Sequence, residues 1–195
     1  KSDTGHDSKY VLLEENEAYD FHRHGFDVYQ SSFATLRRNY ANSRGRADLP
    51  GYPSHSCCTP KGDEGFVLYG SDDSVAENNI DEGNEMFSSY GERDRFIGNV
   101  VLKDHWGFVI SHHCCGAEIK AVDNVLINNA AINTLSTGYI ETSAVNTRVE
   151  NQTSLGSANQ NGAAGNNNHS SQQNPDTSWT VFPSTTIRNS LFVNN

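Results

Sequence analysis

The sequence is short of the residues that mark several protein classes. It has 1 Met, 5 Pro and 14 Lys plus Arg against 24 Asp plus Glu, which gives a formal net charge of −10. This surplus of acid argues against a nucleic-acid partner, because phosphates are neutralised by clustered Lys and Arg. No apolar run approaches the roughly 20 residues that a membrane-spanning helix needs. The 16 Gly show no triplet period and no heptads recur, which excludes collagen and coiled-coil classes.

Asparagine, serine and aromatic residues are abundant instead. The 195 residues include 22 Asn, 21 Ser and 19 aromatic residues (9 Phe, 8 Tyr and 2 Trp). Asn, Ser and Gly disfavour helices and favour turns, whereas recurring aromatic residues indicate a packed core rather than disorder. The composition therefore predicts short strands joined by many turns.

Seven stretches repeat an apolar residue two or three places before an asparagine and a small or apolar residue two places after it. The asparagines are Asn16, Asn39, Asn78, Asn99, Asn128, Asn151 and Asn189, with spacings of 23, 39, 21, 29, 23 and 38. The shorter spacings predict a repeat of about 22 residues, and the longer ones predict insertions. A second element, Gly followed by Phe or Tyr, recurs at Gly25, Gly65, Gly107 and Gly138.

A repeat of about 22 residues with short strands and an asparagine at one corner resembles the right-handed parallel β-helix of the pectate-lyase-like superfamily. The resemblance runs from Tyr10 to the C-terminus. It implies an all-β solenoid of about seven coils, with loop insertions at residues 42–63, 111–121 and 157–178. Corner asparagines tolerate left-handed backbone angles, and their amides can hydrogen-bond along a ladder. Leucine-rich repeats share the period but need fixed leucines that are absent here.

The alignment places Asn78 opposite Asn99 and leaves one question open. The apolar residue lies three places before the first two asparagines of the series but two places before the last two. Either the inward side switches between coils, or the alignment is shifted by one residue in some of them. The same alignment predicts a column of alternating charge in which Glu15, Arg38 and Glu77 stack. We expect a single domain over residues 1–195, either complete or an excerpt of a longer chain.

Four cysteines occupy two similar pentapeptides inside the insertions: Cys57 and Cys58 follow Ser-His-Ser, and Cys114 and Cys115 follow Ser-His-His. Both pairings that join one pentapeptide to the other stay open, since a bond within a Cys-Cys pair closes a strained ring. Such cross-links would favour an oxidising, extracellular compartment. A tetrahedral zinc site and free buried thiols are the alternatives, although the usual two-residue spacer of zinc sites is missing.

Acidic residues are the second group of candidates. Ten acids fall between residues 63 and 94, and among them Asp72, Asp73, Asp81 and Glu82 are candidate oxygen ligands for Ca²⁺. The resemblance implies such a cation in lyases. A solvated acidic face explains the same pattern without any cofactor.

Two sequons are candidate glycosylation sites. They begin at Asn151 and Asn168. Asn168 is expected in a polar loop, where a host enzyme could reach it. Asn151 is expected in the corner ladder, where it would be buried.

Two functions compete. The first is a structural or adhesive protein outside the cell, a segment or subunit of a surface fibre, with carbohydrate or neighbouring β-helix subunits as partners. The second, which the resemblance implies, is a polysaccharide-active enzyme, a lyase or a glycoside hydrolase with paired carboxylates or a basic residue in a groove. Tyr69, Tyr90 and Tyr139 are candidates for stacking on sugar rings or, alternatively, for a core stack. An acidic chain repels polyuronates, which favours the structural hypothesis.

Overall fold

The chain folds into short strands joined by tight corners. The computed structural model describes residues 8–21, 23–43, 64–84, 87–111, 121–135, 138–142, 144–156, 166–168 and 186–193. These residues form 20 strands and no helix. Within the same ranges, therefore, no helix is long and apolar enough to cross a membrane.

The strands stack into three sheets in which neighbouring strands are parallel. The first sheet has the order β1-β4-β7-β10-β13-β16-β19, with bounds Leu12–Glu14, Thr35–Arg37, Val75–Glu77, Arg95–Ile97, Val125–Ile127, Arg148–Glu150 and Thr186–Arg188. The second has the order β2-β5-β8-β11-β14-β17-β20, with bounds Glu17–Tyr19, Tyr40–Asn42, Ile80–Glu82, Val100–Leu102, Ala130–Ile132, Thr153–Leu155 and Leu191–Val193. The third has the order β3-β6-β9-β12-β15-β18, with bounds His24–Tyr29, Glu64–Tyr69, Phe87–Ser89, Phe108–Ser111, Tyr139–Thr142 and Asn166–Asn168.

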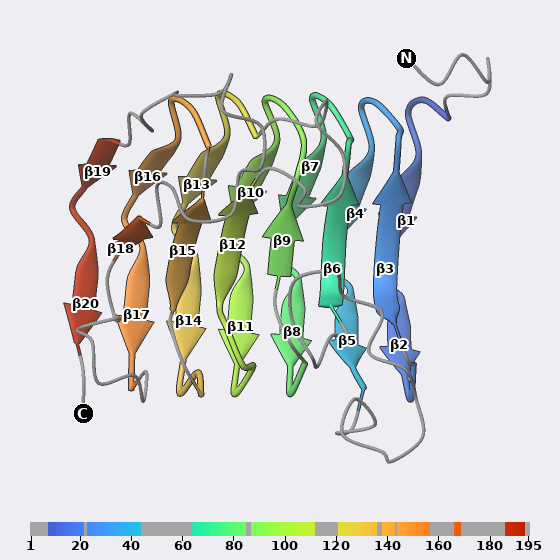
Figure 1. Ribbon diagram of the computed structural model, residues 1–195. Coiled ribbons are helices and arrows are strands. Elements are labelled where there is room, and N and C mark those ends of the chain that lie inside the picture. Colours follow the sequence, from blue (N-terminus) through green and yellow to red (C-terminus); the bar gives the residue numbers. More distant parts are fainter. Residues whose placement is uncertain are drawn as a thin grey trace, which may run out of the picture.

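Chain order explains why all three sheets are parallel. The chain visits the first, second and third sheets in turn and then returns to the first, so each strand pairs with the strand three further along the chain (Figure 1). Parallel neighbours cannot be joined by a hairpin and need such a crossover. The all-β prediction is confirmed, and the stacked parallel strands are consistent with a parallel β-helix.

A ladder of buried asparagines runs along the corner between the first and second sheets. The backbone N–H of Asn39 donates to Oδ1 of Asn79 at 2.9 Å, that of Asn79 donates to Oδ1 of Asn99 at 3.0 Å, and that of Asn99 donates to Oδ1 of Asn129 at 2.9 Å. Each side-chain Nδ2 also donates to the next Oδ1, at 2.9–3.1 Å. Buried amides satisfied in this way avoid the cost of unpaired polar groups and fix the spacing of the strands.

The register differs by one residue from the sequence alignment in part of the chain. Ala76 pairs with Phe96, which places Asn79, not Asn78, opposite Asn99. Asn78 and Asn128 instead occupy the preceding position, where the backbone is left-handed with φ of 54° and 58°. Adjacent asparagines allow two alignments, and the predicted one is wrong there. Of the two explanations left open, the shifted alignment is therefore correct in this part of the chain.

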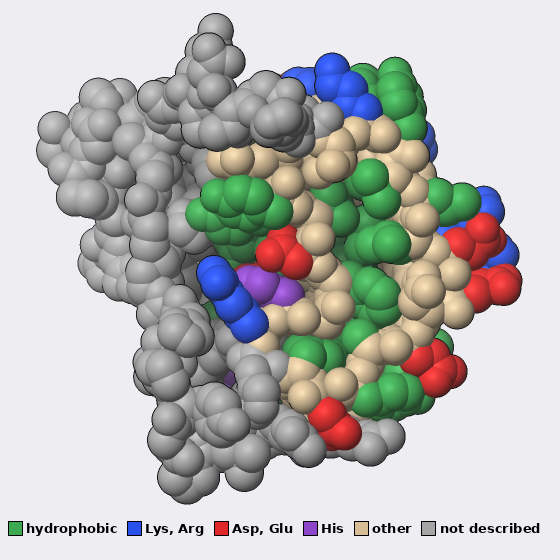
Figure 2. All heavy atoms as spheres, turned by 90° about the vertical axis from the view of Figure 1, so that its right-hand side faces the viewer, with side chains coloured by type: hydrophobic (Ala, Val, Ile, Leu, Met, Phe, Trp, Pro, Cys, Tyr) green, Lys and Arg blue, Asp and Glu red, His purple; other side chains and the backbone are tan. Residues whose placement is uncertain are grey.

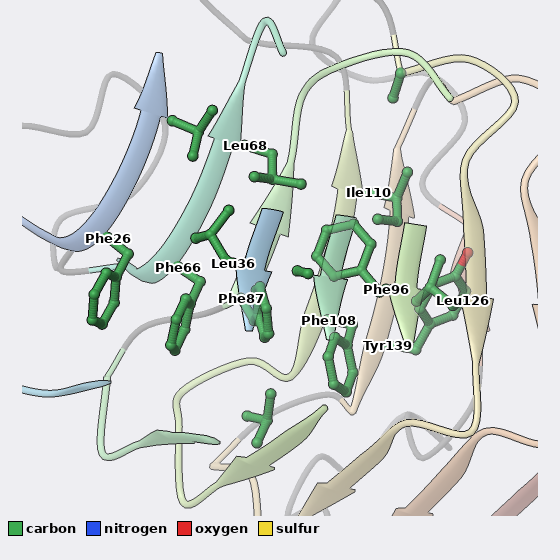
Figure 3. Packing of buried hydrophobic residues seen from close by; sticks show 14 of the residues in the cluster. Phe26, Leu36, Phe66, Leu68, Phe87, Phe96, Phe108, Ile110, Leu126 and Tyr139 are labelled. Atoms are coloured by element: carbon green, nitrogen blue, oxygen red, sulfur yellow. The ribbon is translucent and has the colours of Figure 1, made fainter. Parts of the chain in front are cut away.

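Aromatic rings stack on the inner face of the third sheet. Phe26, Phe66, Phe87, Phe108 and Tyr139 are register partners in successive strands and point into the core (Figure 3). The first two rings are stacked at 4.9 Å between centroids, and the next pair is tilted at 4.7 Å. The recurring Gly-aromatic element is thus a core stack, and Tyr139, a candidate for sugar stacking, is fully buried.

Opposite charges stack on the outer face of the first sheet, in two columns rather than one. Arg38 bonds to Glu15 at 2.8 Å, as predicted. Glu77 belongs to the neighbouring column, where Arg37 lies 2.8 Å from Glu14 and 3.6 Å from Glu77. The hydrogen bond from Arg37 lowers the pKa of Glu14. The predicted column is therefore right for its first pair and wrong for Glu77, because of the same one-residue shift.

Candidate functional site

The four acids proposed as Ca²⁺ ligands lie in different environments. Asp73 forms an ion pair with Arg93 at 2.7 Å, which lowers the pKa of Asp73. Asp72 lies one residue earlier and accepts a hydrogen bond from the backbone N–H of Glu92 at 3.3 Å. Glu82 points outward from β8 beside Lys103, at 3.7 Å, whereas Asp81 points into the core. In the part of the chain that the structure describes, no group of three or more His, Cys, Asp or Glu side chains is placed to hold a metal ion.

The two sequons differ from their expected surroundings. Asn151 is exposed with φ of 52°, and its Nδ2 donates to Oδ1 of Asn128 at 3.0 Å, so it is not a buried ladder residue. Asn168 ends strand β18, which pairs with β15, so it does not lie in a loop. For Asn151 the difference follows from the one-residue shift in register, which places Gln152 in the ladder column, and for Asn168 it follows from the pairing of β18 with β15. The four cysteines, Cys57, Cys58, Cys114 and Cys115, lie outside the described residues.

A polar cluster lies at the start of the third sheet. Glu64, the first residue of β6, contacts His24 of β3 through Oε2 at 3.1 Å from Nδ1. The other oxygen of Glu64, Oε1, accepts a hydrogen bond from the hydroxyl of Tyr90 at 2.8 Å. We call His24, Glu64 and Tyr90 the acid–histidine cluster. Strand register brings together residues that are 40 and 26 positions apart in sequence.

Tyrosine rings and a further acid adjoin this cluster. Tyr29 and Tyr69 stack at 4.9 Å between centroids, and Tyr69 meets Tyr90 edge to face at 5.8 Å. Partial removal from water raises the pKa of Asp27, which the nearby charge of Glu64 raises further. Burial also raises the pKa of Tyr69 to about 12. Figure 2, seen from the end formed by β1, β2 and β3, shows apolar side chains in the middle of this end and charged ones mainly toward its edge.

The outer surface of the second sheet is apolar over most of its length. In each three-residue strand the middle residue points inward, and the first and third point outward. On β8, β11, β14, β17 and β20, eight of the ten outward residues are apolar: Ile80, Val100, Leu102, Ala130, Ile132, Leu155, Leu191 and Val193. We call these eight residues the outer apolar face.

Register places these side chains in two columns, of which one is continuous from Leu102 to Val193 and the other is interrupted by Thr153. Val100 pairs with Ile80 on one side and Ala130 on the other, and Ile132 lies between Leu102 and Leu155. Leu191 is 54% exposed, and the remaining seven residues are half-buried or exposed. Neighbouring strands are about 4.8 Å apart, so the columns form one surface rather than scattered apolar residues.

The sequence carries a signal for this face that the repeat pattern does not include. Val100-Val101-Leu102 and Ala130-Ala131-Ile132 are runs of three apolar residues, and a strand that is apolar on both sides has two faces to cover. No comparable signal existed for the acid–histidine cluster, because His24 and Glu64 come from β3 and β6, Tyr90 follows β9, and the three follow no common spacing.

Comparison with known proteins adds no family assignment. No protein-family model matches the chain, and no curated protein matches it.

Proposed function

We propose that this chain is a structural, adhesive right-handed β-helix of about seven coils that works outside the cell and attaches through its outer apolar face. Its partners are neighbouring β-helix subunits or a carbohydrate surface. The observation that carries the proposal is the run of eight apolar side chains on the outside of the second sheet.

The contrast between sheets supports a role for this face. The outer side of the first sheet mixes apolar residues with charged ones: beside Val75, Ile97, Val125 and Ile127 it carries the stacked ion pairs of Glu14, Arg37 and Glu77, which are stable in water. On the five strands that carry the outer apolar face, Glu82 is the one charged residue that points outward. Apolar side chains held in contact with water cost free energy that a partner surface would recover.

The size of the face indicates how it would attach. Five strands about 4.8 Å apart and about 10 Å long cover roughly 240 Å², whereas each partner in a stable pairwise complex buries about 800 Å². A single contact of this kind would be weak. Many copies along a fibre, or on an extended flat surface, would gain strength through avidity. This fits a structural or adhesive function better than a tight one-to-one complex.

Sedimentation velocity and co-pelleting with insoluble polysaccharides test the proposal. The variant Leu102→Lys/Ile132→Lys places two charges in the centre of the face, and Thr35→Lys places one charge on the outer side of the first sheet as a control. We expect the wild type and the control to self-associate or pellet, and the double variant to stay monomeric and unbound. The proposal is rejected if the double variant, folded by circular dichroism, behaves like the wild type.

A polysaccharide-active enzyme is the second candidate, and the acid–histidine cluster favours it. A carboxylate between a histidine and a tyrosine hydroxyl can orient a proton donor or acceptor. Partial burial also raises the pKa of the neighbouring Asp27, and raised carboxyl pKa values are common at catalytic sites. The adjoining Tyr29 ring is exposed and could stack on a sugar.

A product assay separates the two functions. Neutral and acidic polysaccharides are incubated with the wild type, with Glu64→Gln and with Thr35→Lys, and reducing ends and unsaturated products are measured. The enzyme hypothesis predicts cleavage by the wild type and the control, and at least a hundredfold loss in Glu64→Gln. If the wild type cleaves none of the polysaccharides, the enzyme hypothesis is rejected and the adhesive function is favoured.

A further inference from the structure

A carboxyl group lies inside the core of the second sheet, at a position that holds small or apolar residues in neighbouring strands. Asp81, the middle residue of β8, is the register partner of Ala41 and Val101 and is 0% exposed. Asn84 donates to its Oδ1. The side chain lies so close to Gly65 of β6 that a methyl group there would overlap with Oδ1. Only glycine at that position leaves room for the acid.

A second buried carboxyl group meets the first. Asp104 follows β11 at the next corner and is also 0% exposed. Its Oδ1 accepts a hydrogen bond from the backbone N–H of Asn84 at 2.9 Å. The two carboxyl groups lie within hydrogen-bonding reach of each other. In each of them Oδ2 is buried without a donor partner.

Two adjacent carboxylate oxygens need a positive species between them, because both are acceptors and their charges repel. A hard cation such as Ca²⁺ requires six or more oxygen ligands, and among the described residues around the pair the two Oδ2 atoms are the unpartnered oxygens. A proton needs no further ligand. We propose that Asp81 and Asp104 hold a shared proton and form a lock between β8 and β11 that is stable in acid and weakens as the pH rises.

The charges around the pair act in the same direction. Burial is the main cause that raises the pKa of Asp81 well above its ordinary value and the pKa of Asp104 to about 7. Glu64 on β6 adds repulsion at Asp81, and Glu82 on β8 adds repulsion at Asp104. Lys103 lies on the outer side, 3.7 Å from Glu82, at a position exposed to solvent.

The direction of the pH effect follows from proton binding. An unfolded aspartate has an ordinary pKa of 3.8, so between about pH 4 and pH 7 the folded chain holds more protons than the unfolded chain. Stability from the pair is therefore complete in acid and is lost as the pH rises through this window. Each extra proton in the folded state changes the unfolding equilibrium constant by about tenfold per pH unit.

Urea unfolding of the full chain between pH 4 and pH 8 tests the lock. The variant Asp81→Asn keeps Oδ1 for Asn84 and offers an N–H to Asp104, so it mimics the protonated pair. The unfolding equilibrium constant of the wild type should rise with pH. For Asp81→Asn we expect this rise per pH unit to be at least tenfold smaller. Asp123→Asn, at an exposed position, is the control and should keep the wild-type slope. Buried Asp94 is present in all three proteins and contributes the same slope to each. Equal slopes for Asp81→Asn and the wild type would overturn the proposal.

A measurement on the unaltered chain covers the case in which Asp81→Asn does not fold. Carboxyl ¹³C shifts of the two aspartates, followed by NMR from pH 3 to pH 9, report their protonation directly. We expect both signals to shift together through one step above the ordinary range of aspartate, because loss of the shared proton is felt by both carboxyl groups. If both titrate independently near pH 4, the pair holds no shared proton and the proposal fails.

Discussion

Removal of one ladder asparagine should cost a large part of the stability of the chain. Oδ1 of Asn99 accepts hydrogen bonds from the backbone N–H and Nδ2 of Asn79, at 3.0 and 2.9 Å. Nδ2 of Asn99 donates to the backbone oxygen of Ala76 at 2.8 Å and to Oδ1 of Asn129 at 3.1 Å. All three asparagine side chains are buried, so water does not replace the lost partners.

The expected loss for Asn99→Ala follows from the two donors of Asn79 that are left unpaired. A stranded buried donor costs about 1–3 kcal/mol, which gives roughly 2–6 kcal/mol for both. Urea denaturation followed by circular dichroism measures the free energy of unfolding, with the slope against urea expected to be unchanged.

Asn78→Gly is the matched control for this experiment. Asn78 lies one position from the ladder, is exposed and has φ of 54°, a conformation that glycine adopts without strain. We expect a change below about 1 kcal/mol for this variant. A loss below 1 kcal/mol for Asn99→Ala, or an equal loss for Asn78→Gly, would refute the assigned register.

Three further variants follow from the same contacts. Gln152 continues the ladder column, but its side-chain amide is buried without a partner. Gln152→Asn should therefore stabilise the fold by about 1 kcal/mol in the same urea assay, and a loss of stability would contradict the column assignment. Gly65→Ala should destabilise it by roughly 1–3 kcal/mol, because the added methyl group overlaps with Asp81, and an unchanged melting temperature would contradict that packing. Arg37→Glu should lower the melting temperature at low salt and less so at high salt, since it replaces the ion pairs with Glu14 and Glu77 by repulsion; a shift independent of salt would argue against a charge effect.

The period of the fold could be predicted from the sequence, but the register could not. Spacings near 22 residues and the recurring Gly-aromatic pairs indicated the length of one repeat and its short strands. The ladder asparagine follows a left-handed residue, and that position holds Glu15, Arg38, Asn78, Gly98 or Asn128. Because the left-handed residue has no fixed identity, the pattern does not show which asparagine of an adjacent pair is buried.

The candidate sites were less predictable because they depend on contacts between strands. Asp81 belonged to a run of acids that resembled a solvated or metal-binding surface, and the inward direction of its side chain depends on the register of β8. His24 and Glu64 are separated by 40 residues, and nothing in the spacing indicates that they meet. The outer apolar face was visible as apolar triplets, and could have been predicted from them.

Hydroxyl-radical footprinting tests the proposed attachment most directly, because it measures the exposure of individual side chains. The chain is labelled as a dilute monomer and again in its self-associated or polysaccharide-bound form. We predict that Leu102, Ile132 and Leu155 lose reactivity on association, while exposed Tyr29 on the third sheet keeps its reactivity. Protection of Tyr29 with unchanged reactivity of the outer apolar face would contradict the proposed function and favour a binding site at the acid–histidine cluster.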